Sequence, residues 1–287
     1  MKILLTGASG QLGYDVIRYV KQNTNHTLLT PSSKELDLFD ETSIRTYCKN
    51  AEFDAVLHSG AYTGVDKAEE ERDKCFAVNT NGTITLTREA KKRGVPFMFI
   101  STDYVFDGNA KIPYKTFFKK NPINVYGRSK AIAEDVITDE YYDKSMIVRT
   151  STVFGINGNN FIKTMLSLLQ THKTLNVVSD QVSSPTYTRD LAPVLIKILE
   201  NNDFGIYHIT GSGECSKSDL VREIIKIKNA NVVVNDVPSS FFPTPASRPA
   251  YSVLNNQTLK ARGYELLPLW SDALKRFITE FEHPDCL

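Results

Sequence analysis

Short apolar runs alternate with amphipathic stretches over the first half of the chain. Residues 2–6 form an apolar run that ends at a glycine, as buried parallel strands often do. Similar runs predict further strands at 26–30, 55–59, 97–101 and 146–150. Helical spacing between these runs predicts helices at 11–22, 41–49, 66–79 and 80–93. The alternation predicts an α/β fold, a Rossmann-type doubly wound parallel sheet covered by helices on both faces.

The regularity weakens after residue 150. The pattern predicts helices at 160–172, 190–201 and 217–228, with short strands at 176–179 and 206–210. The proline-rich stretch from Pro238 to Pro249 cannot form a regular helix or a central strand, so it is expected to lie as a loop over a surface or a site. We predict an NAD(P)-binding Rossmann domain at 1–150, to which a later segment at about 175–205 returns. A smaller, discontinuous substrate-binding lobe is expected within 151–287.

Composition narrows the class of protein. The 287 residues carry 34 Lys and Arg against 33 Asp and Glu, and the net charge of +1 provides no global attraction to nucleic acid or anionic membranes. No apolar run approaches the roughly 18 residues of a membrane-spanning helix. The four cysteines lack C-x-x-C spacing and the five histidines are scattered, so neither a disulfide framework nor a metal site is expected. The expected protein is cytoplasmic, with reduced thiols, and is a monomer or a homodimer.

Glycines recur where the first predicted strand ends. Gly7, Gly10 and Gly13 span the turn into the first predicted helix. Glycines allow a tight turn and a close approach to a pyrophosphate, while the helix N-terminus supplies unpaired N–H groups and a positive dipole end. The motif could be a plain strand-to-helix turn, but its position after a strand and before an amphipathic helix favours a dinucleotide. We therefore predict cofactor contacts from Gly7, Ser9, Gly10, Gln11 and Leu12.

The end of the second predicted strand bears on the choice of nicotinamide cofactor. An acidic residue about 20 positions beyond the glycines usually holds the free ribose of NAD. Here the sequence offers Ser33 and Lys34, and hydroxyls with a cation suit the 2′-phosphate of NADPH. Glu35 or Asp37 could instead hold a ribose. NADPH is therefore the favoured cofactor and NADH the alternative, with Leu38 expected nearby.

Tyr126 and Lys130 form a Tyr-x-x-x-Lys motif at the start of a helical stretch. Residues four apart share a helix face, so the ammonium is expected near the phenol. A phenol with a pKa of about 10 is a poor acid–base catalyst at neutral pH, and a nearby cation lowers that pKa. Such pairs are common on protein surfaces, but this one follows a phosphate-binding turn and several β–α units. The combination predicts an oxidoreductase of the short-chain dehydrogenase type.

Thr102 follows the strand predicted at 97–101, at the carboxyl edge where open α/β sheets bind ligands. A hydroxyl there can donate a hydrogen bond to a substrate carbonyl as negative charge develops on its oxygen. Ser101 is the competing candidate, since its side chain would point to the opposite side of the strand. Thr102 could also be a local turn hydroxyl. We expect Thr102, Tyr126 and Lys130 to meet beside the nicotinamide.

The order and spacing of these motifs resemble those of the dTDP-4-dehydrorhamnose reductases, a family of extended short-chain dehydrogenases. The resemblance covers nearly the whole chain and includes the glycine turn, AYTGVDKAE at 61–69, STDYVFDG at 101–108, the Tyr126–Lys130 region, 149–151, 158–165, 180–186 and 243–249. It implies a Rossmann domain, a smaller C-terminal substrate domain and NAD(P)H as hydride donor. The hydride would go to C4 of dTDP-4-dehydrorhamnose while Tyr126 protonates the oxygen, giving dTDP-rhamnose.

The resemblance also implies roles for individual residues. Thr102, Tyr126 and Lys130 match the family's catalytic triad, and Lys130 would also hold the nicotinamide ribose. The cofactor would be lined by Gly60, Ala61 and Tyr62. A cation near the diphosphate, from Lys163 or Arg248, makes electrostatic sense. The sugar nucleotide, the expected partner, would contact Thr63, Val65, Thr102, Tyr104, Thr152, Asn160, Lys163 and Arg248.

Two departures from the family pattern keep alternatives open. Thr152 stands where the family commonly has a tryptophan beside the sugar, so the alternative substrate is another dTDP- or GDP-linked keto-sugar. Asp15 matches one ligand of a metal that bridges dimers of some relatives, but Arg189 stands where a carboxylate is expected, so we predict no metal. A non-catalytic, dinucleotide-binding regulatory subunit is a third possibility. The intact set of Thr102, Tyr126 and Lys130 argues against it.

Overall fold

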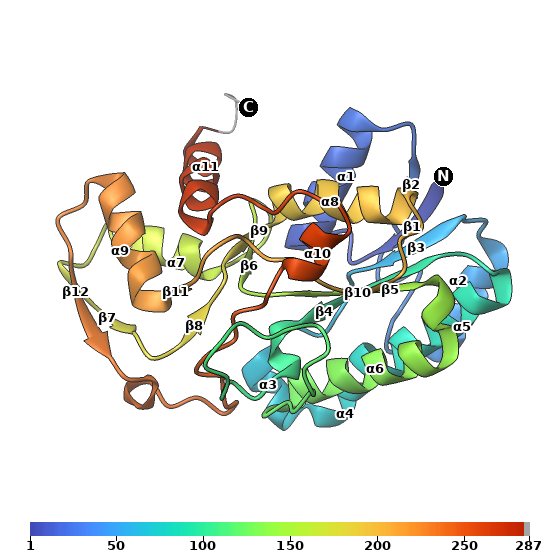
Figure 1. The fold of residues 1–287 in the computed structure, drawn as a ribbon, viewed down its shortest axis with the longest axis horizontal. Helices are drawn as coiled ribbons and strands as arrows, with labels where there is room; N and C mark the ends of the chain where they lie inside the picture. The colour runs from blue at the N-terminus through green and yellow to red at the C-terminus, as the bar shows by residue number, and fades with distance from the viewer. Residues whose placement is uncertain (284–287) are drawn as a thin grey trace.

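The computed structural model describes residues 1–283, and a six-stranded parallel sheet lies at its centre (Figure 1). The strand order is β10-β5-β4-β3-β1-β2, and every pairing in the sheet is parallel. The strands are β1 (Lys2–Thr6), β2 (Thr27–Leu29), β3 (Ala55–His58), β4 (Phe97–Thr102), β5 (Ser145–Thr150) and β10 (Gly205–His208). The order reverses between β1 and β3, which is where doubly wound sheets bind ligands. The predicted fold class is confirmed.

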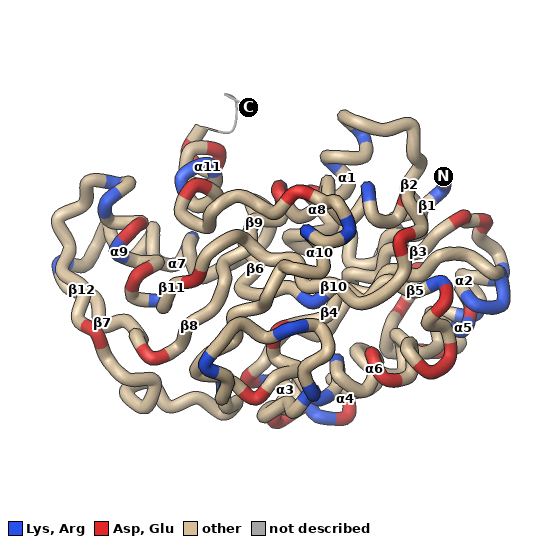
Figure 2. The backbone as a smooth tube through the Cα atoms, viewed as in Figure 1, with Lys and Arg blue, Asp and Glu red and all other residues tan. Residues whose placement is uncertain are grey.

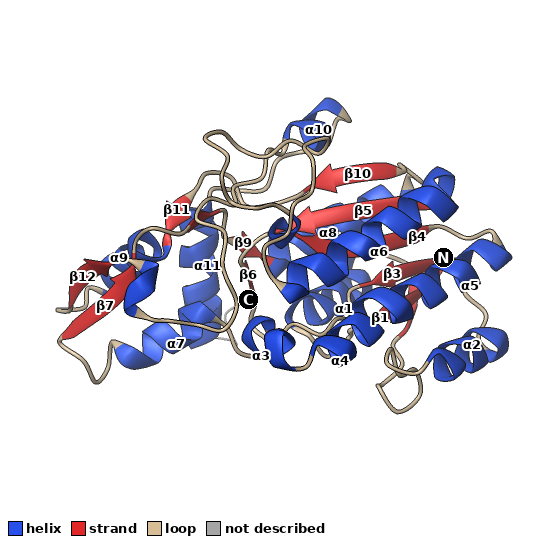
Figure 3. Ribbon diagram, turned by 90° about the horizontal axis from the view of Figure 1, so that it is seen from below, coloured by secondary structure: helices blue, strands red, loops and turns tan. Residues whose placement is uncertain are grey.

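Helices cover both faces of this sheet (Figure 3). The alternation along β1 shows why, because Ile3 and Leu5 belong to the core on one face and Leu4 to the core on the other. The first core is completed by α1 (Gln11–Asn23) and α8 (Thr188–Glu200). The second is completed by α2 (Glu41–Asn50), α5 (Thr83–Arg93) and α6 (Val125–Tyr141). The apolar strands are thus buried on both sides, as their sequences indicate.

The segment between β3 and α5 differs from the two helices expected at 66–79 and 80–93. It consists of α3 (Val65–Glu70), α4 (Arg72–Phe76) and a π-helix, η1 (Ala77–Gly82), that runs into α5. Asn79 explains the wide turn, because its amide accepts a hydrogen bond from the backbone N–H of Tyr62 (2.7 Å) and donates to the hydroxyl of Ser129 (3.0 Å). These tertiary contacts outweigh the regular helix that local spacing favours. Such turns often occur at functional sites.

The later elements build a second hydrophobic core beside the sheet domain, at the left of Figure 1. Its elements are β6 (Val153–Phe154), α7 (Phe161–Leu168), β7 (Thr174–Val178), β8 (Val182–Ser183), β9 (Thr186–Tyr187), β11 (Cys215–Ser216), α9 (Lys217–Lys228), β12 (Val233–Val237) and α11 (Trp270–Glu282). The segment that returns to the sheet comprises α8 and β10. It begins later than the expected 175–205, because Leu175 and Val177 of β7 are buried in the second core.

Short helical turns complete the chain, and helix ends differ from expectation by a few residues. The turns are η2 (Asp103–Val105), η3 (Tyr142–Lys144), η4 (Ser239–Phe241) and α10 (Gln257–Ala261). The largest difference is in α7, which ends at Leu168 although spacing predicted a helix to 172. The proline-rich stretch contains only the single turn η4 and is otherwise loop, as expected.

Acidic and basic residues are interspersed along the backbone, without a face of one sign in the view of Figure 2. Among residues 1–283, no helix has both the length and the apolar character that crossing a bilayer requires. Cys48, Cys75 and Cys215 are buried free thiols, and Cys286 lies outside the described residues. The charge distribution agrees with the expectation that no global field attracts a polyanion.

A buried ion pair fixes α6 against the sheet. Arg149 of β5 donates to Glu134 of α6 (Nη2–Oε2, 2.7 Å), and both side chains are almost fully buried. Arg149 also donates to the carbonyl of Thr116 (2.9 Å), while Ser101 of β4 donates to Glu134. Burying two charges is tolerable only when the remaining donors and acceptors have partners, as they do here. The pair and its hydrogen bond from Ser101 therefore join α6 to the neighbouring strands β4 and β5.

Replacing Arg149 by methionine should strongly destabilise the fold. The change leaves the Glu134 carboxylate buried without its guanidinium, which typically costs about 3–5 kcal/mol of unfolding free energy. The double variant Arg149→Met with Glu134→Leu should lose clearly less than the two single variants together, because no isolated charge remains. Urea denaturation of the four proteins measures this. Equal costs for the double variant and the summed singles would show that the two charges do not interact.

Candidate active site

The glycine turn has the geometry of a phosphate-binding loop. Gly7 has a φ of +72°, and a Cβ there would lie 2.6 Å from the backbone nitrogen of Gly60. A Cβ at Gly13 would lie 2.2 Å from the carbonyl oxygen of Gly7. The helix α1 starts at Gln11, and no side chain caps its first N–H groups. Backbone donors at a helix N-terminus that side chains leave unpaired are suited to an anion such as a pyrophosphate.

The acidic residues after β2 are engaged in local turns. One carboxylate oxygen of Glu35, Oε2, accepts hydrogen bonds from both the backbone N–H and the hydroxyl of Ser32 (both 2.8 Å). The backbone bond in particular lowers the pKa of Glu35. Asp37 accepts from the N–H of Phe39 (2.9 Å). Ser33 and Lys34 are exposed. Their side chains are therefore accessible to a ligand at this edge.

The segment after β3 lies between the glycine turn and α6. A Cβ at Gly60 would lie 2.7 Å from Leu38 Cδ1, so Leu38 packs beside the turn. Ala61 follows and is partly exposed. Tyr62 belongs to the same small apolar cluster as Tyr126. The structure thus brings several residues predicted to line the cofactor close to the predicted catalytic helix.

The start of α6 packs directly on the segment that follows β4. Asn124 caps the helix by accepting from the N–H of Gly127 (2.7 Å). A Cβ at Gly127 would lie only 2.1 Å from the carbonyl oxygen of Tyr104, so only glycine permits this contact. The ring of Tyr126 meets that of Tyr104 edge-on at 6.1 Å between centroids. This close approach sets Tyr126 beside the end of β4.

Thr102 and Ser101 point to different sides of β4. The Thr102 hydroxyl accepts from the N–H of Tyr104 (3.1 Å) and donates to Asp103 (3.1 Å). Tyr104, two residues after Thr102, contacts the ring of Tyr126, so Thr102 lies near the start of α6. Ser101 instead donates to Glu134 on the opposite side. Thr102 therefore forms the local turn that leads to Tyr104 beside Tyr126, whereas Ser101 belongs to the buried ion-pair network.

The protonation of the predicted catalytic pair differs from the sequence-based expectation. Burial raises the pKa of the Tyr126 phenol, and the nearby Asp103 carboxylate adds to this increase. Burial lowers the pKa of Lys130 to about 7, partly offset by Glu134. The Lys130 ammonium lies 4.0 Å from the ring centroid of Phe99. The net direction at the phenol is upward because burial is the largest cause, and the influence of Lys130 on the phenol stays a prediction.

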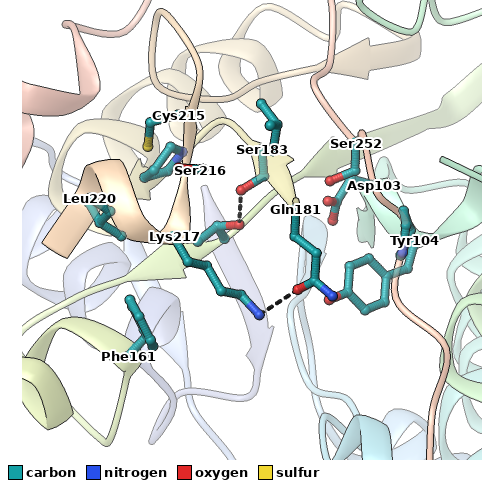
Figure 4. Close-up of a pocket in the computed structure, with 14 residues that line it drawn as sticks. Asp103, Tyr104, Phe161, Gln181, Ser183, Cys215, Ser216, Lys217, Leu220 and Ser252 are labelled. Atoms are coloured by element: carbon teal, nitrogen blue, oxygen red, sulfur yellow. Dashed lines mark hydrogen bonds between the residues drawn. The ribbon is translucent and has the colours of Figure 1, made fainter. Parts of the chain in front are cut away.

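A cavity of about 200 Å³ opens beside the end of β4 (Figure 4). Asp103 and Tyr104 form one wall, and Thr152 lies on another. Thr152 has a φ of +42°, a strained value for a β-branched residue, and its hydroxyl is hydrogen-bonded to that of Ser183 (2.8 Å). The lining combines hydroxyl groups such as those of Thr152 and Ser252 with apolar side chains such as Phe161 and Leu220.

A second cavity, of about 630 Å³, adjoins the first. Phe242, Thr244 and Arg248 from the proline-rich loop line it, so this loop lies over a cavity, as the sequence predicted. Arg248 is paired with Asp66 of α3 (Nη2–Oδ2, 2.6 Å). The loop is therefore held against the sheet domain. The two cavities share three lining residues: Phe161, Gln181 and Lys217.

Several residues predicted to bind the substrate line neither cavity. Thr63 is exposed and Val65 begins α3. Asn160 donates to the side chain of Gln11 (3.0 Å), which ties α7 to the glycine turn. The Lys163 ammonium donates to the backbone carbonyls of Ile156 and Gly158. The cavities instead include Asp103, Gln181 and Lys217, which the sequence-based set omits. Asp103 could have been found, since it directly follows Thr102, but no local pattern distinguishes Lys217.

The residues around Asp15 do not fit a divalent cation. Arg189 pairs with Glu280 (Nη1–Oε2, 2.7 Å), and Arg18 pairs with the same carboxylate. Burial raises the pKa of Asp15, which also accepts a hydrogen bond from Thr188. Two guanidinium groups already neutralise Glu280, and a cation there would be repelled. The cluster instead joins α1 and α8 to the C-terminal helix.

Comparison with known proteins identifies the family. Residues 1–283 match the model of the RmlD substrate binding domain. The spore coat polysaccharide biosynthesis protein SpsK of Bacillus subtilis is 37% identical over 279 residues, which cover 97% of each chain. A dTDP-4-dehydrorhamnose reductase structure from Clostridium acetobutylicum has a TM-score of 0.95 at 37% identity and covers 98% of this chain and 100% of its own. Another, from Bacillus anthracis in complex with NADP, has a TM-score of 0.92 at 34% identity and covers 97% and 99%. The chain therefore belongs to the dTDP-4-dehydrorhamnose reductase family, NAD(P)H-dependent oxidoreductases of the extended short-chain dehydrogenase type.

Proposed function

We propose that the chain reduces the C4 keto group of a nucleotide-linked 6-deoxy sugar, converting dTDP-4-dehydrorhamnose to dTDP-rhamnose. The observation that carries this proposal is the packing of the start of α6, with Tyr126, against Tyr104, two residues after Thr102, beside a cavity walled by Asp103 and Tyr104. Lys130 lies one turn further along α6. Relatives named dTDP-4-dehydrorhamnose reductase support the choice of sugar nucleotide.

The chemistry assigned to each residue follows from its protonation. A bound nicotinamide supplies the hydride to C4 of the sugar. Tyr126 donates a proton to the ketone oxygen, and its raised pKa keeps the phenol protonated at neutral pH, which is the form that reduction requires. Thr102 donates a hydrogen bond to the same oxygen as charge develops. Lys130 in its ammonium form binds the nicotinamide ribose and stabilises the phenolate left after proton transfer.

NADPH is the cofactor that the exposed residues after β2 favour. Ser33 and Lys34 are accessible, whereas Glu35 and Asp37 are occupied by local turns and are poorly available to a free ribose. The relative from Bacillus anthracis in complex with NADP agrees with this choice. The remaining cofactor contacts proposed are those of the glycine turn and its neighbours: Gly7, Ser9, Gly10, Gln11, Leu12, Leu38, Gly60, Ala61 and Tyr62.

We propose that residues 1–150, with α8 and β10, bind the cofactor. The later elements mainly bind the sugar nucleotide. Tyr104, Thr152 and Arg248 line the two cavities and remain the proposed substrate contacts. The protein is proposed to act in the cytoplasm as a monomer or homodimer.

Thr152 favours a second candidate substrate, a different dTDP- or GDP-linked keto-sugar. Its short side chain leaves the cavity wall polar and without an aromatic stacking surface. The similarity to a spore coat polysaccharide biosynthesis protein is compatible with a different sugar. The reduction of C4 by the same residues would be unchanged.

Tyr126→Phe should abolish reduction and leave cofactor binding intact. Removal of the proton donor is expected to lower kcat by about 10²–10⁴-fold, since general acid catalysis contributes this much. NADPH oxidation is measured with a panel of dTDP- and GDP-linked 4-keto-6-deoxy sugars, and NADPH affinity by fluorescence titration. A variant that reduces the sugar at the normal rate would disprove the assigned proton donor. A wild-type protein that binds NADPH but reduces no member of the panel would favour the regulatory subunit.

Lys34→Ala should weaken the binding of NADPH without weakening the binding of NADH. Loss of one charge-assisted hydrogen bond to the 2′-phosphate is expected to raise the KM for NADPH by roughly tenfold and to leave the KM for NADH unchanged. Lys49→Ala, at an exposed position of α2, is the matched control and should change neither value. Equal effects of Lys34→Ala on both cofactors would place the 2′-phosphate elsewhere.

Cofactor affinity should fall as the pH rises through about 7. The lowered pKa of Lys130 means that its ammonium form is complete below this pH and is lost above it. Affinity of the free enzyme for NADPH and NADH is therefore expected to decline above about pH 7, by up to tenfold per pH unit. Titrations of wild type and Lys130→Met are compared from about pH 6 to about pH 9. A pH profile unchanged by Lys130→Met would assign the titration to another group.

A further inference from the structure

The two cavities meet at a wall that contains one lysine. Phe161, Gln181 and Lys217 line both the cavity of about 200 Å³ and that of about 630 Å³. The smaller cavity also contacts Asp103 and Tyr104, next to Tyr126. A ligand that reaches from the catalytic residues into the larger cavity must therefore pass Lys217 (Figure 4).

Lys217 carries a charge that no carboxylate in direct contact neutralises among residues 1–283. Its ammonium donates to the amide oxygen of Gln181 (2.7 Å) and forms no salt bridge with a carboxylate anywhere in residues 1–283. Arg248 is its cationic neighbour, and that guanidinium is already paired with Asp66. Burial and the nearby Arg248 lower the pKa of Lys217, while Asp180 and Asp66 act in the opposite direction without forming a salt bridge with it. An anionic ligand would relieve this unfavourable charge and pair with it.

The character of the two cavities identifies the anion. The smaller one lies toward the catalytic residues, where the reacting sugar must be, and offers the hydroxyls of Ser183 and Ser252 beside apolar side chains. The larger one presents the rings of Phe161 and Phe242, together with Met165 and Leu168, which suit the flat apolar faces of a nucleobase. In a nucleotide sugar, the group between these two parts is the diphosphate.

Lys163, which the sequence also suggested as a diphosphate ligand, points away from the two cavities. Its ammonium donates to the carbonyls of Ile156 and Gly158 and lies 5.1 Å from the ring centroid of Phe281. It lines neither cavity. Lys217 begins α9, so the positive end of the helix dipole adds to its own charge.

We propose that Lys217 binds the diphosphate of the nucleotide sugar where the two cavities meet. The sugar then extends into the smaller cavity and the nucleoside into the larger one. This assignment rests on the proposed function, since it requires a nucleotide sugar as substrate. Gln181 positions the ammonium between the cavities, and Arg248 contributes a second positive charge while it remains paired with Asp66.

The test compares Lys217→Met with Lys226→Met. Methionine keeps the length of the alkyl chain and removes only the charge, and Lys226 provides a matched control on the exposed face of the same helix. Calorimetric titration with dTDP and with GDP probes the diphosphate without requiring turnover. Lys217→Met should weaken binding of the nucleotide that wild type prefers by about 10- to 100-fold, and Lys217→Arg should restore part of it. NADPH affinity and the thermal midpoint of unfolding should stay unchanged.

The outcomes separate this assignment from the proposed function. If wild type binds dTDP or GDP and Lys217→Met binds it equally well, Lys217 is not the diphosphate ligand, although reduction of a nucleotide sugar still stands. A loss of NADPH affinity or of thermal stability that matches the loss of nucleotide binding would also overturn the assignment, because it would indicate a structural role. If wild type binds neither nucleotide, the proposal of a nucleotide-sugar substrate is disproved, and the proposed role of Lys217 is disproved as well.

Discussion

The site depends on a helix that stays buried although it carries charge on its inner face. Lys130 and Glu134 lie one helical turn apart on that face, and both are almost fully buried. Their charges are tolerable because Glu134 faces Arg149 of β5 and also interacts with Lys130. The same carboxylate accepts from Ser101, one residue before Thr102. The ion pair that holds the helix in place is therefore also part of what aligns the hydroxyl and the phenol.

The two cores are joined at the glycine turn and at the C-terminal helix. Gln11 accepts hydrogen bonds from the N–H of Gly155 (2.9 Å) and from Asn160, so the start of α1 is tied to the start of α7. On the other side, Glu280 of α11 holds Arg18 and Arg189. The proposed cofactor and substrate sides are thereby fixed relative to each other at the edge where hydride transfer would occur. Such rigid placement is what orientation of two reactants requires.

Properties set by local sequence were predictable, and those set by tertiary contacts were not. The apolar runs determine the strands of the sheet, and glycine spacing locates the turn after β1, because both depend on neighbours in the chain. The spacing of Tyr126 and Lys130 on one helix face was predictable for the same reason, because it depends only on residues four positions apart. The sign of the pKa change at Tyr126 depends instead on burial and on Asp103. The proposed choice of Lys217 over Lys163 depends on tertiary contacts, because backbone carbonyls hold the Lys163 ammonium whereas Lys217 meets Gln181 at the wall between the cavities, and no sequence pattern records this.

The π-helix Ala77–Gly82 limits which deletions this segment of the chain can accommodate. A π-turn amounts to one residue more than an α-helix of the same length needs. Deletion of a single residue here would restore an ordinary helix between the same flanking elements but change the direction in which the residues inside the segment point. Asn79 would then face away from Ser129 and Tyr62, and the backbone at Gly82, where a Cβ would lie 2.3 Å from the carbonyl oxygen of Leu38, would lose its fit. The length of this segment is thus constrained as tightly as the identity of its residues.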